Sequence, residues 1–482
     1  MTDIKKNMTN WRWWMCLLLF VATTVNYLDR QVLSLTWKDF IAPEFHWTDS
    51  DYGTITGFFS IFYAVACLFA GKFVDWMGTK KGYLWAIGIW SLGACMHAGC
   101  GWVTMHLEGY ASLEALRAVE YGSDAALAIA SVSVWLFLVC RAILALGEAG
   151  NFPAAIKVTA EYFPKKDRAF ATSLFNAGAS VGALVAPLSI PVLASAWGWE
   201  MAFIIIGALG FVWMFFWLYM YDKPAESKHV NQAELDYMLQ DEKEQPAETT
   251  PTAEAEKTIP FIRCFGYKQT WSFIVGKFFT DGVWWFYLFW APAYFSECGY
   301  SMDTTMGKML VFVLYLIVTV ISIGGGYLPK LFVEQKHMEP YSGRMLAMLI
   351  FAFFPLLALF AQPLQGISVW FPAVIIGIAG AGHQAWSANL FSTIGDMFPK
   401  STIASITGIG AMAGGIGSFL INKGAGMLFD YSAAQGEAFS FFGFSGKPAG
   451  YMIVFCICAV AYLLAWFIMK SLVPKYKPIV LK

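Results

Sequence analysis

The chain has 482 residues, of which 58% are hydrophobic, 17% are aromatic and only 13% are charged. A soluble domain is usually near half apolar and a quarter charged, so these proportions exclude an ordinary soluble domain and indicate a membrane protein. Lys and Arg total 32 against 33 Asp and Glu; this net charge of -1 favours no class of partner, and we expect no nucleic acid.

Long apolar runs recur from Trp11 to Leu472, and each is near the roughly 20 residues that a helix needs to cross a bilayer. Runs such as FLVCRAILALGEAGNFPAAI do not alternate in polarity, as the strands of a membrane β-barrel would. The sequence therefore predicts an all-α membrane protein with about twelve transmembrane helices in two groups of six. The expected spans are 12–36, 52–74, 82–103, 131–157, 169–195 and 200–222, then 269–293, 304–330, 344–362, 371–395, 403–429 and 450–472.

Basic residues distinguish the two sides of the predicted membrane. Cytoplasmic loops carry an excess of Lys and Arg, so both termini are expected in the cytoplasm and the chain in the cell inner membrane. The first apolar run has no small-residue cleavage site, so we expect it to be retained as a helix. The basic groups are Lys5, Lys6 and Arg12, then Lys80 and Lys81, then Lys165, Lys166 and Arg168, then the segments from Lys223 to Lys268 and from Lys475 to Lys482.

A polar, charged stretch with several prolines separates the two groups of spans and is unsuited to a bilayer. We therefore expect an N-terminal six-helix bundle (1–222), a cytoplasmic linker (223–268) and a C-terminal six-helix bundle (269–482). Within the linker, AELDYMLQDEKE is compatible with a short amphipathic helix, whereas QPAETTPTAEAE is typical of a flexible segment.

The two halves are related by an internal repeat. A shift of 235 positions places Gly147 on Gly382, and the tripeptide FPK recurs at the same offset. The shift also places Glu148 on His383, so one deep ionisable position differs between the halves. Transporters built from two similar halves bind cargo near the bilayer midplane and rock one half against the other.

The connection between the third and fourth spans, residues 104–130, is unusually long and lies on the outer side; no function is assigned to it. The nine cysteines are scattered, most of them in apolar runs, and show no paired spacing. We therefore expect neither disulfides nor a metal, and no cofactor.

Four charged residues lie inside predicted spans, where a central charge costs roughly 2.5 to 3.5 kcal/mol on insertion scales. Asp29 and Arg30 belong to the first span, and Arg141 and Glu148 lie on one face of the fourth, about 10 Å apart. Because guanidinium groups bind carboxylates and a neighbouring carboxylate can exchange a proton, these residues predict a cavity for a small organic anion coupled to protons. Alternatively, Asp29 pairs with Arg141 or Arg30, and Arg141 with Glu148, only to neutralise buried charge.

Other charged groups have simpler interpretations beside functional ones. The cytoplasmic turns DWMGTKK (75–81) and EYFPKKDR (161–168) are interpreted either as gate latches or as plain positive-inside signals. Lys277 and Asp281 are four residues apart, which favours a local ion pair near the cytoplasmic entrance. The glycines of the fifth and eleventh spans favour close helix packing.

Two segments mix aromatic rings with hydrogen-bonding groups, DGVWWFYLFWAPAYF in the seventh span and GHQAWSANLF in the tenth. Such rings stack on the C–H faces of a sugar, although interfacial aromatic belts use the same residues. Asn176, deep in the fifth span, either bonds a neighbouring helix or faces cargo hydroxyls. The residues expected to contact cargo are Asn176 and, from these two segments, Tyr287, Trp290, His383, Trp386 and Asn389.

Several segments resemble signatures of the anion:cation symporter family of the major facilitator superfamily: NYLDR, GKFVDWMGTK, RAILALGEAGNFPAAIK, YFPKKDRAFATSLFNAGASVGALVAP and SANLFSTIGDMFPK. DGVWWFYLFWAPAYF, GGYLPKLF and GHQAWSANLF most resemble the hexuronate transporter branch. The resemblance covers nearly the whole chain and implies the major facilitator fold. It also implies proton-coupled uptake of galacturonate or glucuronate.

The resemblance assigns roles to particular residues. Arg30 and Arg141 would engage the cargo carboxylate, Asp29 and Glu148 would take part in proton coupling, and Tyr63 matches a cavity tyrosine of the second span. In the hexuronate branch, the residues placed to contact the sugar are Asn176, Trp290, Trp386 and Asn389.

The sequence departs from the family pattern at two places. Cys67 and Leu68 lie where many relatives have a glutamine, and the 104–130 connection is longer than usual. The first departure leaves the sugar preference open.

The sequence thus predicts a secondary active transporter, not an enzyme, that imports a hexuronate or a similar sugar acid with protons by alternating access, as a monomer. A symporter or exchanger of another organic anion, such as an aldonate or a dicarboxylate, is the alternative within transport, and sodium in place of protons stays open. A non-transporting sensor of sugar acids is the alternative outside it.

Overall fold

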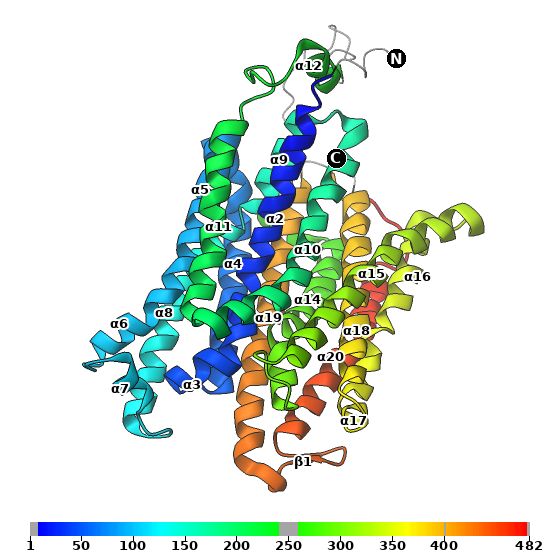
Figure 1. The fold of residues 1–482 in the computed structure, drawn as a ribbon. Coiled ribbons are helices and arrows are strands. Elements are labelled where there is room, and N and C mark those ends of the chain that lie inside the picture. Colours follow the sequence, from blue (N-terminus) through cyan, green and yellow to red (C-terminus); the bar gives the residue numbers. More distant parts are fainter. Residues whose placement is uncertain (1–7, 241–258, 400–401, 480–482) are drawn as a thin grey trace.

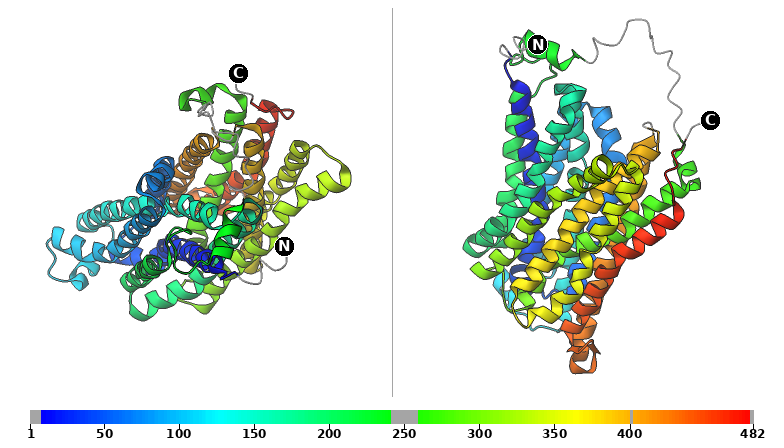
Figure 2. Two further views of the ribbon diagram at one scale, coloured as in Figure 1. Left: turned by 90° about the horizontal axis from the view of Figure 1, so that it is seen from above. Right: turned by 90° about the vertical axis from the view of Figure 1, so that its right-hand side faces the viewer.

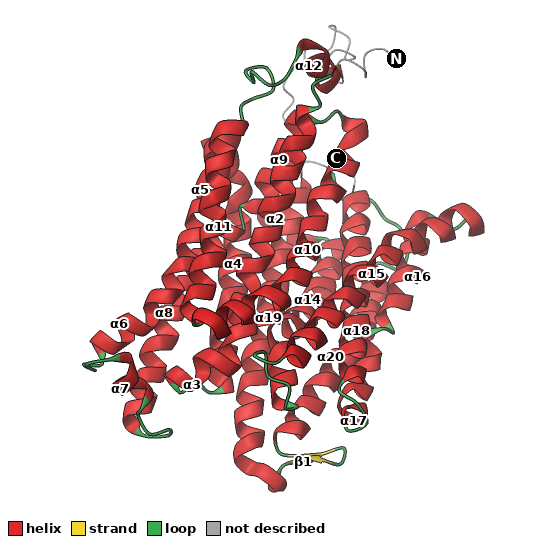
Figure 3. Ribbon diagram, in the orientation of Figure 1, coloured by secondary structure: helices red, strands yellow, loops and turns green. Residues whose placement is uncertain are grey.

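The structure is a computed structural model that describes residues 8–240, 259–399 and 402–479. Over these residues it is a bundle of long helices with a single two-stranded β-hairpin (Figures 1 and 3). The N-terminal half contains α2 (Trp11–Thr36), η1 (Trp37–Ile41), α3 (Ala42–Phe45), α4 (Asp49–Met77), α5 (Thr79–Met96), η2 (His97–Gly99), α6 (Cys100–Leu107), α7 (Leu113–Arg117), α8 (Asp124–Glu148), α9 (Asn151–Tyr162), α10 (Lys165–Trp197) and α11 (Trp199–Met220).

The chain continues through α12 (Gln232–Met238) into the C-terminal half. That half contains η3 (Phe261–Gly266), α14 (Lys268–Glu297), α15 (Thr305–Lys336), α16 (Pro340–Ala352), η4 (Pro355–Phe360), α17 (Ala361–Gln365), α18 (Trp370–Met397), α19 (Ile403–Gln435), η6 (Gly436–Ala438), β1 (Ser440–Phe441), β2 (Phe444–Ser445) and α20 (Lys447–Leu472). The two short strands pair antiparallel.

Helical structure falls on each predicted span, so the expected helical fold is confirmed, although the ninth span, 344–362, is divided among α16, η4 and α17. Within the described residues, nine helices are long and apolar enough to cross a membrane. The remaining spans fall on α2, α14 and α18, which are less apolar. These three helices carry Arg30, Trp290 and His383, whereas other predicted site residues, such as Arg141 and Tyr63, lie on more apolar helices.

The region around the fourth span differs from the prediction. The helix begins at Asp124, where Ser123 caps it by accepting a hydrogen bond from the backbone N–H of Ala126, rather than at 131. It is interrupted after Glu148 and resumes as α9 at Asn151. Much of the expected 104–130 connection is therefore helical, and Glu148 stands at the end of a helix.

The internal repeat has a counterpart in packing. A Cβ atom on Gly382 would lie 2.8 Å from the Cβ of Phe354, so only glycine lets α18 approach η4 this closely. At the equivalent position, Gly147 brings α8 against the backbone of α5 at Trp90. Equivalent helices of the two halves are thus packed together through equivalent glycines, Gly147 and Gly382.

The beginning of α2 and the end of α20 lie at one face of the bundle, which we name the terminal face (Figure 2). The opposite face carries α7 and the hairpin, and we name it the loop face (Figure 1). The predicted linker helix is present as α12 at the terminal face. Its Glu234 accepts hydrogen bonds from the backbone N–H groups of Trp11 and Arg12 and pairs with the Arg12 side chain at 3.0 Å, so α12 caps α2.

Candidate functional site

The charged residues of the first and fourth spans meet inside the N-terminal half. Arg30 Nε and Nη2 both donate to Oε2 of Glu148, at 3.0 and 2.9 Å, and both residues are buried. The last residue of α8 therefore lies beside α2. Face sharing along one helix suggested Arg141 as its partner, but the ion pair that forms is Arg30–Glu148.

Aromatic rings surround the Arg30 guanidinium. Its central carbon lies 5.2 Å from the ring of Tyr27, 4.7 Å from Tyr63 and 5.3 Å from Trp285. Trp285 belongs to α14, so this guanidinium touches both halves of the molecule. Rings at these distances stabilise a cation in a site that holds little water.

Arg141 and Asp29 are also buried, at 2% and 1% exposure. Arg141 lies 5.2 Å from the ring of Phe59, and its Nε and Nη1 find no hydrogen-bond partner among the described residues. The Asp29 carboxylate is within electrostatic range of Arg141 and Glu148, and the indole N–H of Trp90 lies beside it. Buried polar groups are normally satisfied, so the unused donors of Arg141 are unusual for a buried guanidinium.

A cavity of about 470 Å³ lies between the two halves. Its walls come from α2, α9 and α10 on one side and from α14, α15 and α18 on the other. It joins the aromatic surroundings of Arg30 through Tyr27, and it presents the predicted Asn176 together with several hydroxyl and amide groups. The main polar and aromatic lining residues are Tyr27, Asn176, Ser180, Trp284, Tyr315, Thr319, Gln384, Ser387 and Phe391.

His383 lies next to this cavity. Its ring stacks on Trp284 with centroids 5.3 Å apart, and its Nδ1 is 2.7 Å from the hydroxyl of Tyr462 on α20. Trp386 is fully buried against Tyr462. The structure therefore places His383 close to the cavity through Trp284, and Trp386 behind it inside the C-terminal half.

Three other predicted contacts lie outside the cavity wall. Trp290 donates to Oδ1 of Asn422 at 3.0 Å and belongs to an aromatic cluster nearer the loop face. Tyr287 is buried close to Cys458 of α20. Asn389 donates to the carbonyl of Ala385 and lines a different hollow, on the side of α15 and α16.

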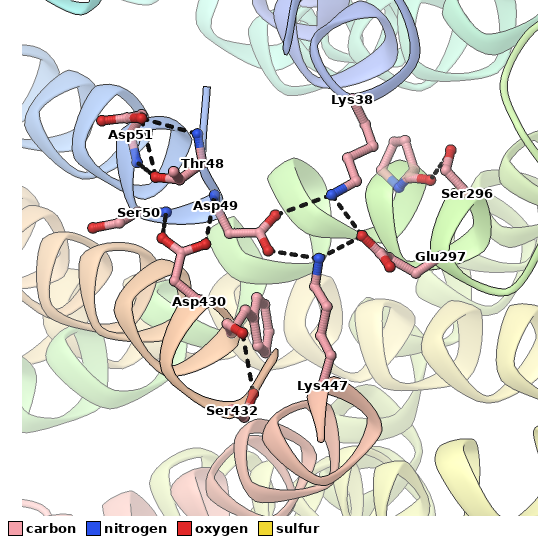
Figure 4. A network of polar contacts seen from close by, with 12 residues as sticks. Lys38, Thr48, Asp49, Ser50, Asp51, Ser296, Glu297, Asp430, Ser432 and Lys447 are labelled. Atoms are coloured by element: carbon pink, nitrogen blue, oxygen red, sulfur yellow. Dashed lines mark hydrogen bonds and ion pairs between the residues drawn. The ribbon is translucent and has the colours of Figure 1, made fainter. Parts of the chain in front are cut away.

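The loop face is closed by a ring of four charges that joins the halves (Figure 4). Lys38 lies 3.2 Å from Asp49 and 2.5 Å from Glu297. Lys447 lies 2.5 Å from Asp49 and also pairs with Glu297. Each lysine thus contacts one carboxylate from either half. We name Lys38, Asp49, Glu297 and Lys447 the loop-face latch.

Neighbouring groups reinforce the loop-face latch. Asp430 of α19 accepts hydrogen bonds from the backbone N–H groups of Asp49 and Ser50, at 3.0 and 2.7 Å, and so caps α4 from the other half (Figure 4). Tyr52 donates to the carbonyl of Phe289 at 2.8 Å. Helix α4 is therefore held at its first turn by the C-terminal half.

The charged groups of the loop-face latch shift one another's pKa values. Burial raises the pKa of Glu297, but Lys447 and Lys38 outweigh it and hold this pKa below its ordinary value. Burial lowers the pKa of Lys38, but Asp49 and Glu297 outweigh it and raise this pKa above its ordinary value. Both groups stay charged at neutral pH in the latched structure.

The terminal face is joined differently. For the described side chains of the two predicted gate-latch turns, every polar contact stays on the N-terminal side of the chain or on the linker helix. The main contacts are Lys80–Asp222 at 2.8 Å, Lys157–Asp75 at 2.8 Å, Thr79–Glu161 at 2.6 Å and Tyr237–Asp167 at 2.6 Å. No interaction of these groups holds the halves together here, so the described structure is latched at the loop face only.

Sequence reasoning missed the latch and part of the cavity. Lys38, Asp49, Glu297 and Lys447 stand at the ends of predicted spans, far apart along the chain, and no spacing relates them. Trp284 and Trp285, in contrast, stand inside an aromatic segment that the sequence had singled out, but its two faces were not distinguished.

Comparison with known proteins identifies the class. The model of the Major Facilitator Superfamily matches residues 19–421. The hexuronate transporter of Escherichia coli (strain K12) is 27% identical over 424 residues, which cover 87% of this chain and 88% of that relative. The galacturonate transporter of Dickeya chrysanthemi is 27% identical over 329 residues, 68% of this chain and 84% of the relative.

A third relative, the probable galactarate/D-glucarate transporter GarP of Escherichia coli (strain K12), is 26% identical over 300 residues, 61% of this chain and 62% of the relative. Among solved structures, a bacterial homolog of the human lysosomal transporter Spinster, in an inward-facing and unoccupied conformation, has a TM-score of 0.69 at 18% identity and covers 97% of this chain and 99% of that one. A D-xylose-proton symporter has a TM-score of 0.61 at 16% identity, covering 94% and 96%.

The chain therefore belongs to the Major Facilitator Superfamily. It is a multi-pass membrane transporter and not an enzyme, as its sequence predicted. The resemblance to hexuronate transporters seen in individual motifs is confirmed across most of the chain.

Proposed function

We propose that this transporter imports a hexuronate, such as galacturonate or glucuronate, together with protons. The observation that carries the proposal is the buried Arg30–Glu148 ion pair beside Arg141, whose guanidinium keeps unused donors. A carboxylate is the anion that a guanidinium binds best through paired hydrogen bonds. The relatives from Escherichia coli and Dickeya chrysanthemi are named as hexuronate and galacturonate transporters. These names support a sugar acid as the molecule to which this carboxylate belongs.

The remainder of the sugar would face the cavity between the halves. Asn176 and Gln384 offer amide groups to hydroxyls, and Trp284 offers a flat ring to a C–H face. Tyr63 holds the arginine that takes the carboxylate. Trp290, at the closed loop-face end, contacts cargo only when that end opens.

Proton coupling follows from competition for the same guanidinium. With the loop face open, protonated Asp29 and Glu148 leave Arg30 and Arg141 free for the cargo carboxylate. After the halves rock, deprotonation of Glu148 restores its pair with Arg30 and releases the cargo. The latched loop face and the formed Arg30–Glu148 pair correspond to the end of this cycle.

The orientation follows from the basic residues. The terminal face, with Arg12, Lys80 and the linker helix, is assigned to the cytoplasm, and the loop face to the outside of the inner membrane. Import then proceeds from the loop face to the terminal face, and the chain works as a monomer, with one cargo path between its halves.

The test is uptake of labelled galacturonate into proteoliposomes under an imposed pH gradient, with a sodium gradient as the comparison. The wild type is expected to accumulate the acid, Arg141→Ala to lose uptake, and Glu148→Gln to lose gradient-driven accumulation while keeping exchange of bound cargo. Arg344→Ala, which removes an arginine outside the cavity, is the matched control. Accumulation by Glu148→Gln equal to that of the wild type would refute the coupling role.

A further inference from the structure

A groove of about 530 Å³ lies at the terminal face, away from the cavity between the halves. One wall is the turn from η3 into α14, and the other is the chain that follows α20. All of its lining residues therefore belong to the C-terminal half. Its volume is within the range of roughly 300 to 1,000 Å³ that is usual for ligand sites.

Hydrogen bonds hold the chain that follows α20 against the bundle. The side chain of Gln269, which is only 6% exposed, donates to the carbonyl of Lys477 at 2.8 Å. Two residues further on, the N–H of Ile479 donates to the carbonyl of Met397 at 2.8 Å. The backbone on both sides of the groove is thus fixed, and the groove is a feature of the folded protein.

The charged residues that line the groove are three lysines, Lys268, Lys475 and Lys477, which we name the groove lysines. All three are exposed, and no carboxylate of the described residues lines the groove or pairs with them. Lys80 and Lys157, at the same face, do have carboxylate partners. Like charges around one hollow repel one another, so an anion that enters the groove relieves this repulsion.

Exposed apolar side chains adjoin the groove on the η3 side. Phe261 and Ile262 are 48% and 76% exposed, and Trp271 in the first turn of α14 is 47% exposed. Four residues of a 3₁₀-helix rise about 8 Å, so Ile262 lies about this distance along η3 from Gly266 at the groove. Exposed tryptophan at the end of a span is typical of the membrane–water interface. A cationic groove and an apolar surface thus lie side by side at headgroup level.

We propose that this groove binds an anionic phospholipid, with the phosphate among the groove lysines and the acyl chains along Phe261 and Ile262. Basic pockets between membrane helices suit lipid headgroups, and a lipid also covers the apolar surface, which free phosphate leaves exposed. The proposal depends on the membrane location of the chain and not on its cargo. Because the site lies within one half, its contacts are the same in both conformations, and a bound lipid is not expected to open the loop-face latch.

The experiment measures lipid binding to the full-length protein in detergent by native mass spectrometry. The probes are dioleoylphosphatidylglycerol, which is anionic, and dioleoylphosphatidylcholine, which has the same acyl chains and no net charge. The wild type is expected to bind the anionic lipid about tenfold more tightly, and a higher ammonium acetate concentration is expected to weaken this binding by screening. Equal affinities for the two lipids would overturn the proposal.

Substitution of the groove lysines tests the site itself. The triple variant with Lys268→Gln, Lys475→Gln and Lys477→Gln is expected to bind the anionic lipid about tenfold more weakly, because three charges beside the phosphate are lost. These residues are exposed, so the variant is expected to fold. The matched control changes to Gln three exposed lysines outside the groove, Lys223, Lys228 and Lys336. An equal loss of affinity in both triple variants would show that only net charge matters and would overturn the site.

A further comparison distinguishes a lipid from free phosphate. Ile262→Gln is expected to weaken binding of dioleoylphosphatidylglycerol several-fold, because an apolar contact with its acyl chains is lost. Ile367→Gln is the matched control, since Ile367 is 73% exposed and lies outside the groove. Millimolar inorganic phosphate is expected to leave the lipid bound. Displacement of the lipid by phosphate, or unchanged binding in Ile262→Gln, would overturn the proposal of a lipid ligand.

Discussion

The two ends of the interface between the halves differ in whether charged side chains bind across it. At the loop face, Lys38 and Lys447 each bind one carboxylate from either half, and Asp430 caps a helix of the opposite half. At the terminal face, the described charged turns bind partners on their own side, such as Lys157 with Asp75. The difference shows which contacts are exchanged when the halves rock, because only contacts across the interface discriminate between conformations.

The largest effect is expected from Lys447→Glu. This change removes one lysine of the loop-face latch and adds a third carboxylate facing Lys38, so the loop face opens and the open population rises tenfold or more, since about 1.4 kcal/mol already gives tenfold. The measurement is the distance between spin labels carried by noncanonical residues at Tyr121 and Phe442. Lys475→Glu, at the exposed C-terminal tail, serves as control, and an unchanged distance would show that the ring is not a latch.

A somewhat smaller effect is expected from Gly53→Ala. A Cβ atom at Gly53 would lie 2.5 Å from the carbonyl oxygen of Asn422, so α4 and α19 must separate near the latch, at a cost of about 1 to 3 kcal/mol. Gly424→Ala on the same helix pair is the control, because its Cβ would meet nothing within 4 Å. Thermal unfolding in nanodiscs should give a lower midpoint temperature for Gly53→Ala than for Gly424→Ala. Equal midpoints would mean that α4 and α19 tolerate a wider spacing where they cross.

The pH dependence of the latch is expected to be flat around neutrality. Glu297 has a depressed pKa when latched, so its contribution is complete above the ordinary value of about 4.3 and is lost as the pH falls through the depressed value. Lys38 has a raised pKa, so its contribution is complete below about 10.4 and is lost as the pH rises through the raised value. In a variant with Asp29→Asn and Glu148→Gln, which removes the proposed coupling carboxylates, the label distance should stay constant from about pH 5 to 9; a transition near pH 7 in this variant would contradict this.

The smallest effect is expected from Asp75→Asn. Asp75 is exposed and pairs with Lys157 inside the N-terminal half, so its loss should change the open and closed populations of the latched structure less than about twofold. Labels at the terminal face report this directly. A large change in the open and closed populations would contradict the contrast between the two faces. It would mean that the Asp75–Lys157 ion pair, within the N-terminal half, stabilises the closed loop face.

Much of the fold was predictable because length and apolarity alone define a membrane helix. Each predicted span contains a helix, and Gly147 and Gly382 revealed the repeat before any packing was known. The start of the fourth helix was missed because Ser123 caps a helix that begins at Asp124, beyond its apolar run. Capping is set by single side chains, which an apolar window averages out.

The site was predictable in part. Buried charge pointed to Arg30, Arg141 and Glu148, but helical spacing relates residues within one helix and says nothing of which helix lies opposite. The pairing of Glu148 with Arg30 joins two helices, α8 and α2, and Trp290 pairs with Asn422 of α19 instead of facing the cavity. These contacts are specific to one conformation, whereas one sequence must be compatible with every conformation that the protein adopts.

The aromatic cluster between the loop-face latch and Arg30 has an electrical consequence. Trp37 stacks on Tyr52 at 3.9 Å, Trp290 packs edge-on against both, and all three are buried. Cargo that passes from the loop face to the cavity must pass this cluster, and so moves through part of the membrane voltage. One net charge that crosses the whole membrane is worth about 2.3 kcal/mol per 100 mV. A carboxylate accompanied by one proton crosses without net charge, and any extra proton makes transport sensitive to voltage.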